Sequence, residues 1–259
     1  MVYNSIMNKK VAIGAVAIGI ALFLLGMVVA PTKLSAPVKT DSPNANIVRI
    51  VAVHDDTRPL YSIAMEYPQF DAANDSFNRE ISEWANKELS DFKQNAQDNW
   101  KGRQDTLPPG QPKMDFPETP FTFSITWEPK QINSANISII VRMDSFEGGA
   151  HGNSELKTFN YDVVRKRDVT LGDLFPGNAA YLDKVSKYAH DQLVQDLASS
   201  AAEGADTLES MISDGTAPTA ENFSNFMFNG DVIDLYFPKY QVAPGVYGEQ
   251  HVTMPRKGI

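Results

Sequence analysis

The pattern of hydrophobic and polar positions divides the chain into one long uncharged run and a folded remainder. Residues 11–30 carry no charge and no strongly polar side chain, and at about 1.5 Å per residue a helix of this length spans the hydrocarbon core of a bilayer. Lys9 and Lys10 precede the run, which places the short segment 1–10 in the cytoplasm and the rest of the chain outside. We therefore predict a single-pass membrane anchor over 11–30. The alternative is a cleaved signal peptide ending at Ala30.

After the uncharged run, the sequence predicts a tether followed by strands. Residues 31–46 are rich in proline, serine, threonine and asparagine with few side chains to bury, which is typical of a flexible tether. Runs of β-branched and aromatic residues, separated by turn residues, predict strands. These are 47–54, 60–67 (ended by Pro68), 121–127, 137–143, 156–164 and 249–255. Asn229-Gly230 between the runs 223–228 and 231–237 predicts a hairpin, because both residues tolerate left-handed backbone.

Apolar residues three and four positions apart predict helices elsewhere. The longest covers 71–100, with Asp71 as its N-cap, and we expect its aromatic stripe to pack on a sheet. A second helix is predicted over 179–199 and a short third one over 206–213. The fold class is therefore α+β: an antiparallel-rich sheet with two main helices packed on it, preceded by one N-terminal transmembrane helix. We expect two subdomains, 47–145 and 146–259.

Composition narrows the classes of function. The chain has 259 residues, no cysteine and a net charge of −9. The absence of cysteine excludes thiol catalysis, cysteine-based zinc sites and disulfides. The negative charge argues against nucleic acid as a partner. The four histidines are scattered, and neither a Gly-x-Ser-x-Gly elbow nor a phosphate-binding loop is present. We therefore predict no metal, no cofactor and no enzymatic activity.

One stretch near the middle of the chain stands out for its glycines. Gly148, Gly149 and Gly152 fall within five residues, and His151 lies among them. Three glycines allow backbone conformations that other residues avoid, so we expect a tight loop between two strands. The loop is either a purely structural bulge or a ligand-contacting loop. Further along, the stretch 165–168 is a basic, charged turn, which we expect to be solvated.

Motifs in both halves carry a resemblance to known families. They are Gly148-Gly149-Ala150-His151-Gly152, the turn at 171–175, Tyr240-Gln241-Val242-Ala243-Pro244 with Gly248, and Tyr67-Pro68 with Phe77-Asn78. The second half resembles the C-terminal half of RsiV-type extracytoplasmic domains. The first half resembles the companion domain of unknown function that also precedes some peptidoglycan deacetylases. Together the resemblance covers residues 47–256.

The resemblance implies the fold and a location in the cell envelope. RsiV-like proteins are membrane-spanning anti-sigma factors whose outer domain binds lysozyme, and they also need a cytoplasmic sigma-binding segment. Only about ten residues precede the uncharged run, so we do not expect an anti-sigma role. We expect a membrane-anchored extracytoplasmic binding or sensing domain, with a protein such as lysozyme or a cell-wall glycan as ligand. The alternative is an envelope hydrolase that uses His151 with Glu147 or Asp144.

The two family-like motifs of the second half predict a shared site. We expect the glycine loop and the segment 240–248 to lie close together, because neither has the composition of a core segment: the first is rich in glycine, and the second breaks its strand at Pro244 and Gly245. His151, Tyr240 and Tyr247 are the predicted binding residues. Gly148, Gly149, Gly152, Pro244 and Gly245 are the predicted structural loop residues.

Overall fold

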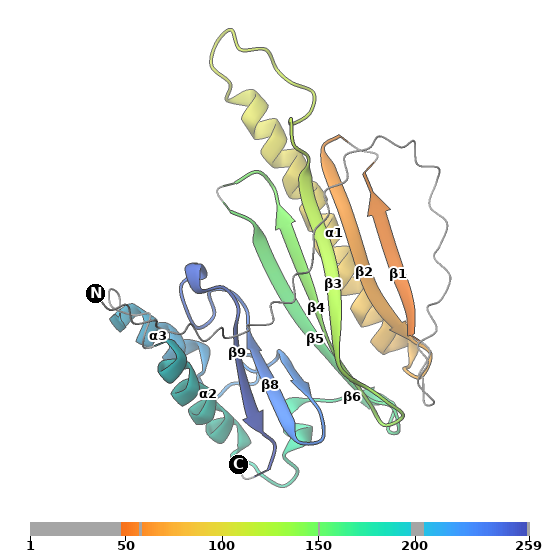
Figure 1. The fold of residues 1–259 in the computed structure, drawn as a ribbon, viewed down its shortest axis with the longest axis vertical. Coiled ribbons are helices and arrows are strands. Elements are labelled where there is room, and N and C mark those ends of the chain that lie inside the picture. Colours follow the sequence, from red (N-terminus) through yellow and green to blue (C-terminus); the bar gives the residue numbers. More distant parts are fainter. Residues whose placement is uncertain (1–47, 57–58, 150, 198–204, 258–259) are drawn as a thin grey trace, which may run out of the picture. The chain divides into compact units, whose positions relative to one another are not determined.

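The computed structural model describes residues 48–56, 59–149, 151–197 and 205–257 (Figure 1). The anchor predicted over 11–30 and the tether predicted over 31–46 lie outside these residues. Within the described part, no helix combines the length and the apolar character that crossing a membrane requires.

A six-stranded sheet occupies the first part of the described chain. Its strands lie side by side in sequence order: β1 (Val48–Asp55), β2 (Tyr61–Phe70), β3 (Phe121–Ile132), β4 (Asn136–Phe146), β5 (Asn153–Asp162) and β6 (Arg167–Asp168). β2 and β3 pair in parallel, and the other neighbours pair antiparallel. A parallel pair needs a crossover, which α1 (Asp75–Asp105) supplies. The subdomain boundary expected after residue 145 falls at the end of β4, and the sheet continues beyond it.

The long helix α1 covers one face of this sheet (Figure 1). Its core-facing side is formed by Phe77, Ile81, Ala85, Phe92 and Ala96, all at most 2 % exposed, as the apolar spacing predicted. The N-cap prediction was wrong. The helix begins after Asn74, whose side-chain oxygen accepts a hydrogen bond from the Phe77 amide at 2.9 Å, and Asp71 lies in the preceding turn.

The prediction that Pro68 ends the second strand was also wrong. β2 runs through Pro68 to Phe70, and Pro68 lies opposite Ile50 of β1. β3 pairs with β2 only as far as Met65. Beyond Met65, β2 has a single neighbouring strand, and such an edge position tolerates a residue without an amide hydrogen.

A second, three-stranded sheet with two helices forms the rest of the described chain. It contains β7 (Phe226–Phe228), β8 (Val232–Phe237) and β9 (Gln250–Pro255), preceded by a 3-10 turn η1 (Leu171–Leu174) and by helices α2 (Tyr181–Leu197) and α3 (Ala205–Gly215), with η3 (Gly245–Tyr247) before β9. α2 packs on β9 and α3 packs on α2. The α+β class is confirmed, but the helices cover two sheets where we predicted one.

The hairpin predicted at Asn229-Gly230 is present between β7 and β8. Its turn works differently from the prediction, because Gly230 does not have positive φ. The side-chain oxygen of Asn229 instead accepts hydrogen bonds from the amides of Asp231 (3.0 Å) and Val232 (3.1 Å). An asparagine side chain that caps its own turn in this way is a common alternative to a left-handed glycine.

The two sheets meet where β7 lies against β4 and β5. Ser138 and Asn160 are buried there, and the Ser138 hydroxyl donates to Asn160 at 2.6 Å. Asn160 donates to the Phe226 carbonyl at 2.8 Å, and the Phe228 amide donates to Ser138 at 3.0 Å. Side chains of the first sheet therefore satisfy backbone groups of β7, and the two sheets are held in one arrangement.

Candidate functional site

A small crevice lies where the end of the first sheet faces the second. It has a volume of about 110 Å³. Its polar lining comes from three separate segments: Arg142 and Asp144 on β4, Ser154 and Glu155 on β5, and Lys239 and Glu249 around the 240–248 segment. The residues that flank the glycine loop therefore meet the residues that flank the terminal motif. We refer to this feature as the intersheet crevice.

An ion pair forms one wall of the intersheet crevice. Arg142 Nη2 and Nε lie 3.0 and 3.2 Å from the two carboxylate oxygens of Glu249, and Arg142 Nη1 lies 3.3 Å from Glu128. Burial alone would lower the pKa of Arg142, but the hydrogen bond and charge of Glu249 outweigh it and raise the pKa above its ordinary value. Asp144 and Lys239 line the same crevice as a carboxylate and an ammonium group.

The glycine loop is the hairpin loop between β4 and β5, as predicted. Gly148 has φ of +75°, and an added Cβ there would lie 2.6 Å from Arg103 and 2.7 Å from Phe121. Glu147 accepts a hydrogen bond from Asn99 at 3.3 Å, and burial raises the pKa of the Glu147 carboxyl. The loop is thus fastened to the C-terminal end of α1 and the start of β3.

His151 is exposed on this loop. Its Nδ1 lies 3.0 Å from the Gly152 carbonyl oxygen. With its hydrogen on Nδ1, His151 donates to this carbonyl oxygen. Its Nε2 then carries no hydrogen and points away from the Gly152 carbonyl, so Nε2 can accept a proton. Gly152 itself is needed for close packing, since a Cβ there would lie 2.9 Å from the Ser145 carbonyl oxygen.

The 240–248 segment is partly core, contrary to our expectation. Val242 and Ala243 are each 1 % exposed and belong to the core of the second sheet. Tyr240 has φ of +74° and is 55 % exposed, and its ring lies so close to Gly245 that a Cβ added there would collide with it. Tyr247 is half-buried against the same core. Gly245 therefore has a packing role, and Tyr240 is the exposed aromatic ring of the segment.

A second polar arrangement lies between α2 and α3. Ser213 Oγ is 3.4 Å from His190 Nε2, and His190 Nδ1 is 3.7 Å from Asp191 Oδ1. This is the order of groups in serine hydrolases. The second distance is too long for a hydrogen bond, and Asp191 already pairs with Lys187 at 2.7 Å. Among the described residues, no group of three or more His, Asp and Glu side chains could hold a metal ion.

Comparisons with known proteins divide the chain at about the same place as the structure. Residues 55–154 match the family model described as Deacetylase PdaC. Residues 172–257 match the model of DUF3298, described as a protein of unknown function. The first match covers α1 and the strands β2, β3 and β4 of the six-stranded sheet, and the second covers α2, α3 and the three-stranded sheet.

Two curated proteins are similar over longer stretches. The chain is 31% identical over 221 residues to the peptidoglycan-N-acetylmuramic acid deacetylase PdaC of Bacillus subtilis, which covers 85% of this chain and 42% of that protein. It is 25% identical over 150 residues to the esterase Rv3036c of Mycobacterium tuberculosis, covering 58% of this chain and 62% of the esterase. The chain thus spans about half the length of these curated relatives. The 31% identity to this deacetylase and the match to the Deacetylase PdaC model overturn the expectation that the chain has no enzymatic activity.

Two solved structures share the fold. DUF3298 family proteins of Bacteroides fragilis and Pseudomonas aeruginosa superpose with TM-scores of 0.52 and 0.51, each at 16% sequence identity. The matches cover 82% and 83% of this chain and 92% of each of those chains. At this identity, the likeness concerns the fold alone.

The sequence analysis named Asp144, which lines the intersheet crevice, but the predicted binding residues His151, Tyr240 and Tyr247 do not line it. Residues that flank the glycine loop and residues that flank the terminal motif line it together. The sequence analysis did not find Arg142, Lys239 or Glu249. No spacing signal links these three residues, because β4 and β9 are about a hundred positions apart and belong to different sheets.

Proposed function

We propose that this chain is an extracytoplasmic protein that hydrolyses acyl groups on cell-wall material. The observation that carries the proposal is the 31% identity to a peptidoglycan deacetylase over 85% of the chain. The second named relative is an esterase. Deacetylases and esterases share one reaction, in which water attacks an acyl carbonyl and the bond to nitrogen or oxygen breaks.

The intersheet crevice supports this proposal because it holds the groups that the reaction needs. Asp144 is the carboxylate that we propose takes a proton from the attacking water while the water oxygen bonds to the acyl carbon. Lys239 is the lining cation that we propose stabilises the oxyanion that forms. The acyl bond then breaks, and the leaving amine or alcohol takes the proton from Asp144. The exposed His151 and Tyr240 on the neighbouring loops are proposed to contact the glycan.

The proposed location follows from the same relatives. A protein that acts on the cell wall works outside the cytoplasm, which agrees with the membrane anchor expected over residues 11–30. The second half is proposed to be RsiV-like, with a cell-wall glycan as the preferred ligand. In intact cells, added protease should digest residues 48–257 and leave the anchor in the membrane fraction. Protection of the C-terminus inside the cell would contradict this location.

The test of activity measures acetate release by the purified chain from acetylated peptidoglycan fragments and from p-nitrophenyl acetate. We expect release, and we expect Asp144→Asn to lower kcat by about 10²-fold or more, the usual contribution of a general base. Asp98→Asn is the matched control. Asp98 is an exposed carboxylate on α1 that accepts a hydrogen bond from Gln94 and does not line the crevice.

A third variant separates the two polar arrangements. Ser213→Ala should leave kcat unchanged, and a fluorophosphonate probe should not label the chain, if a crevice carboxylate activates water. Labelling at Ser213 with loss of activity in that variant would move the reaction to the α2–α3 surface. Absence of acetate release from every substrate by the folded chain would contradict the proposed hydrolysis.

A further inference from the structure

A second and larger cavity lies at the opposite end of β5 from the glycine loop. It has a volume of about 360 Å³ and is separate from the intersheet crevice, sharing no lining residue with it. It is lined by the β3–β4 turn, the turn between β5 and β6, the end of η1, the end of β7 and Arg256 after β9. Its charged lining consists of Asp162, Arg165, Arg167, Asp173 and Arg256. We refer to it as the arginine pocket.

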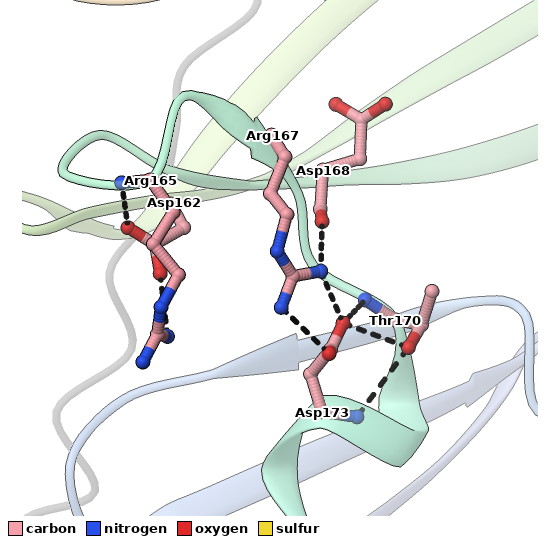
Figure 2. Close-up of polar contacts among 6 residues, drawn as sticks. All are labelled: Asp162, Arg165, Arg167, Asp168, Thr170 and Asp173. Carbon is pink, nitrogen blue, oxygen red and sulfur yellow. Dashed lines mark hydrogen bonds and ion pairs between the residues drawn. The ribbon is translucent and has the colours of Figure 1, made fainter.

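Arg167 in the arginine pocket is already paired with a carboxylate. Its Nη1 and Nη2 lie 2.9 and 2.7 Å from the two oxygens of Asp173, and Figure 2 shows Arg167 and Thr170 converging on this carboxylate. The Thr170 amide and hydroxyl also donate to Asp173, each at 2.8 Å. The hydrogen bond from Arg167 holds the pKa of Asp173 well below its usual range. Asp173 is therefore fully engaged as an acceptor, and it fixes the Arg167 guanidinium in place.

Arg165 is held in a similar way at the tip of the turn. Its amide donates to Asp162 at 2.8 Å, and its Nη1 lies 3.0 Å from the other oxygen of the same carboxylate (Figure 2). Both carboxylates that line the arginine pocket are thus occupied by neighbouring residues of the same turn region.

Arg256 is the remaining charged residue of the lining. Its backbone amide donates to the Asp231 carbonyl at 2.9 Å, which anchors the backbone beside the β7–β8 turn. Among the described residues, its guanidinium forms no ion pair or hydrogen bond. The lining therefore carries three guanidinium groups and two carboxylates, so one positive charge in the pocket is not neutralised by the lining.

We propose that the arginine pocket binds a carboxylate-bearing ligand of the size of a sugar acid, with Arg256 as the group that pairs with its carboxylate. A guanidinium donates two parallel hydrogen bonds to a carboxylate, and the turn already shows this arrangement between Arg167 and Asp173. The volume falls within the range of small-molecule sites. Apolar side chains that suit the carbon face of a sugar ring complete the wall: Val164, Leu174 and Phe228.

The test is titration of the full chain with three small probes that differ in charge: glucuronate, glucose 6-phosphate and glucose. Isothermal calorimetry and amide chemical shifts report binding. We expect glucuronate to bind most tightly, with perturbed amides at Arg165, Arg167 and Arg256. Arg256→Gln should weaken glucuronate binding by about tenfold or more, because the ligand carboxylate loses its charge-assisted hydrogen bonds. Arg256→Lys should restore only part of the affinity, because an ammonium group lacks the planar fork.

Lys257→Gln is the matched control. Lys257 is an exposed cation next to Arg256 that does not line the pocket, and its replacement should leave glucuronate affinity unchanged. Equal thermal stability of the variants shows that each is folded. Equal affinity of wild type and Arg256→Gln would overturn the proposal. Tighter binding of glucose 6-phosphate or of glucose than of glucuronate would also overturn it. Because the crevice is a separate cavity, loss of acetate release in Asp144→Asn has no bearing on this outcome.

Discussion

Arg142 on β4 and Glu249 just before β9 form a two-point ion pair, with contacts of 3.0 and 3.2 Å. The pair joins the two sheets, and its side chains are 25% and 30% exposed. The Arg142 guanidinium also lies 5.7 Å from the centre of the Tyr236 ring. Burial raises the pKa of Tyr236 to about 12, with a further contribution from the charge of Asp234. One pair thus shapes the crevice and links both halves of the chain.

Breaking this pair should destabilise the protein. Glu249→Gln should lower the free energy of unfolding by about 1–2 kcal/mol, because Arg142 is left partly buried without its main partner. Denaturant titration of variants changed at Arg142, at Glu249 and at both positions gives the coupling energy between the two residues. The exposed pair Lys87–Asp91 on α1 is the control and should show much weaker coupling. Equal coupling in the two pairs would mean that the sheets are not held by Arg142 and Glu249.

The glycine loop should reject a methyl group at Gly148 and tolerate it at the next position, Gly149. Gly148→Ala should lower the free energy of unfolding by about 1–3 kcal/mol, because of positive φ and the close approach of Arg103 and Phe121. Gly149→Ala should have little effect, since the nearest atom to its Cβ would be 3.8 Å away. Thermal unfolding of both variants checks this pair of outcomes. Equal stability of the two would show that the loop is not fastened to α1.

The corrected N-cap of α1 gives a direct test. Asn74→Ala should cost about 1 kcal/mol of stability, because the Phe77 amide loses its acceptor. Asp71→Ala should cost clearly less, since Asp71 lies in the turn before the helix. Urea denaturation of the two variants measures the difference. A larger loss for Asp71→Ala would restore the cap that the sequence pattern predicted.

Asp234 should make the protein sensitive to acid. Its side chain is buried, with the residue 3% exposed. Burial alone would raise the pKa of Asp234. Hydrogen bonds from His251, Lys130 and Thr253 outweigh burial and hold this pKa well below its ordinary value. A carboxylate with a depressed folded pKa stabilises the protein above its unfolded pKa of about 4, and the stability is lost as pH falls toward the folded value. Wild type should therefore lose stability below about pH 4.

The matched experiment compares Asp234→Asn with the exposed Asp98→Asn across the acidic range from neutral pH downward. Asp234→Asn should be less stable than wild type at neutral pH, because Lys130 loses a buried partner, and should lose less stability below about pH 4. Asp98→Asn should follow the wild-type curve. Parallel curves for Asp234→Asn and wild type would contradict the role assigned to Asp234.

Much of the local structure could be predicted from the sequence, because it depends on neighbours within one or two turns of chain. The apolar spacing of α1 and α2 placed both helices, and the glycine cluster placed the β4–β5 loop. Local errors arose where two residues compete for one role. Asp71 and Asn74 are both good caps, and only the position of the Phe77 amide decides between them.

The candidate sites depend on contacts that the sequence pattern does not encode. Alternation of apolar residues predicts that β7 and β8 are strands, but it does not show that buried Ser138 and Asn160 of the other sheet bind the backbone of β7. The turn at 165–168 has the composition of a solvated charge cluster, and only the structure shows that Asp162 and Asp173 occupy two of its arginines. The composition of the turn does not reveal these pairs, because Asp162 and Asp173 lie outside residues 165–168.

By itself, the sequence determined the elements, their buried faces and the α+β class, because hydrophobic periodicity reports which side of a helix or strand leaves water. Only the tertiary structure decided that the elements form two sheets, that Asp144 and Glu249 line one crevice, and that Arg256 joins Arg165 and Arg167 around one cavity. These residues are up to about a hundred positions apart. Their approach is set by the packing of whole faces against each other, which no local pattern of residues records.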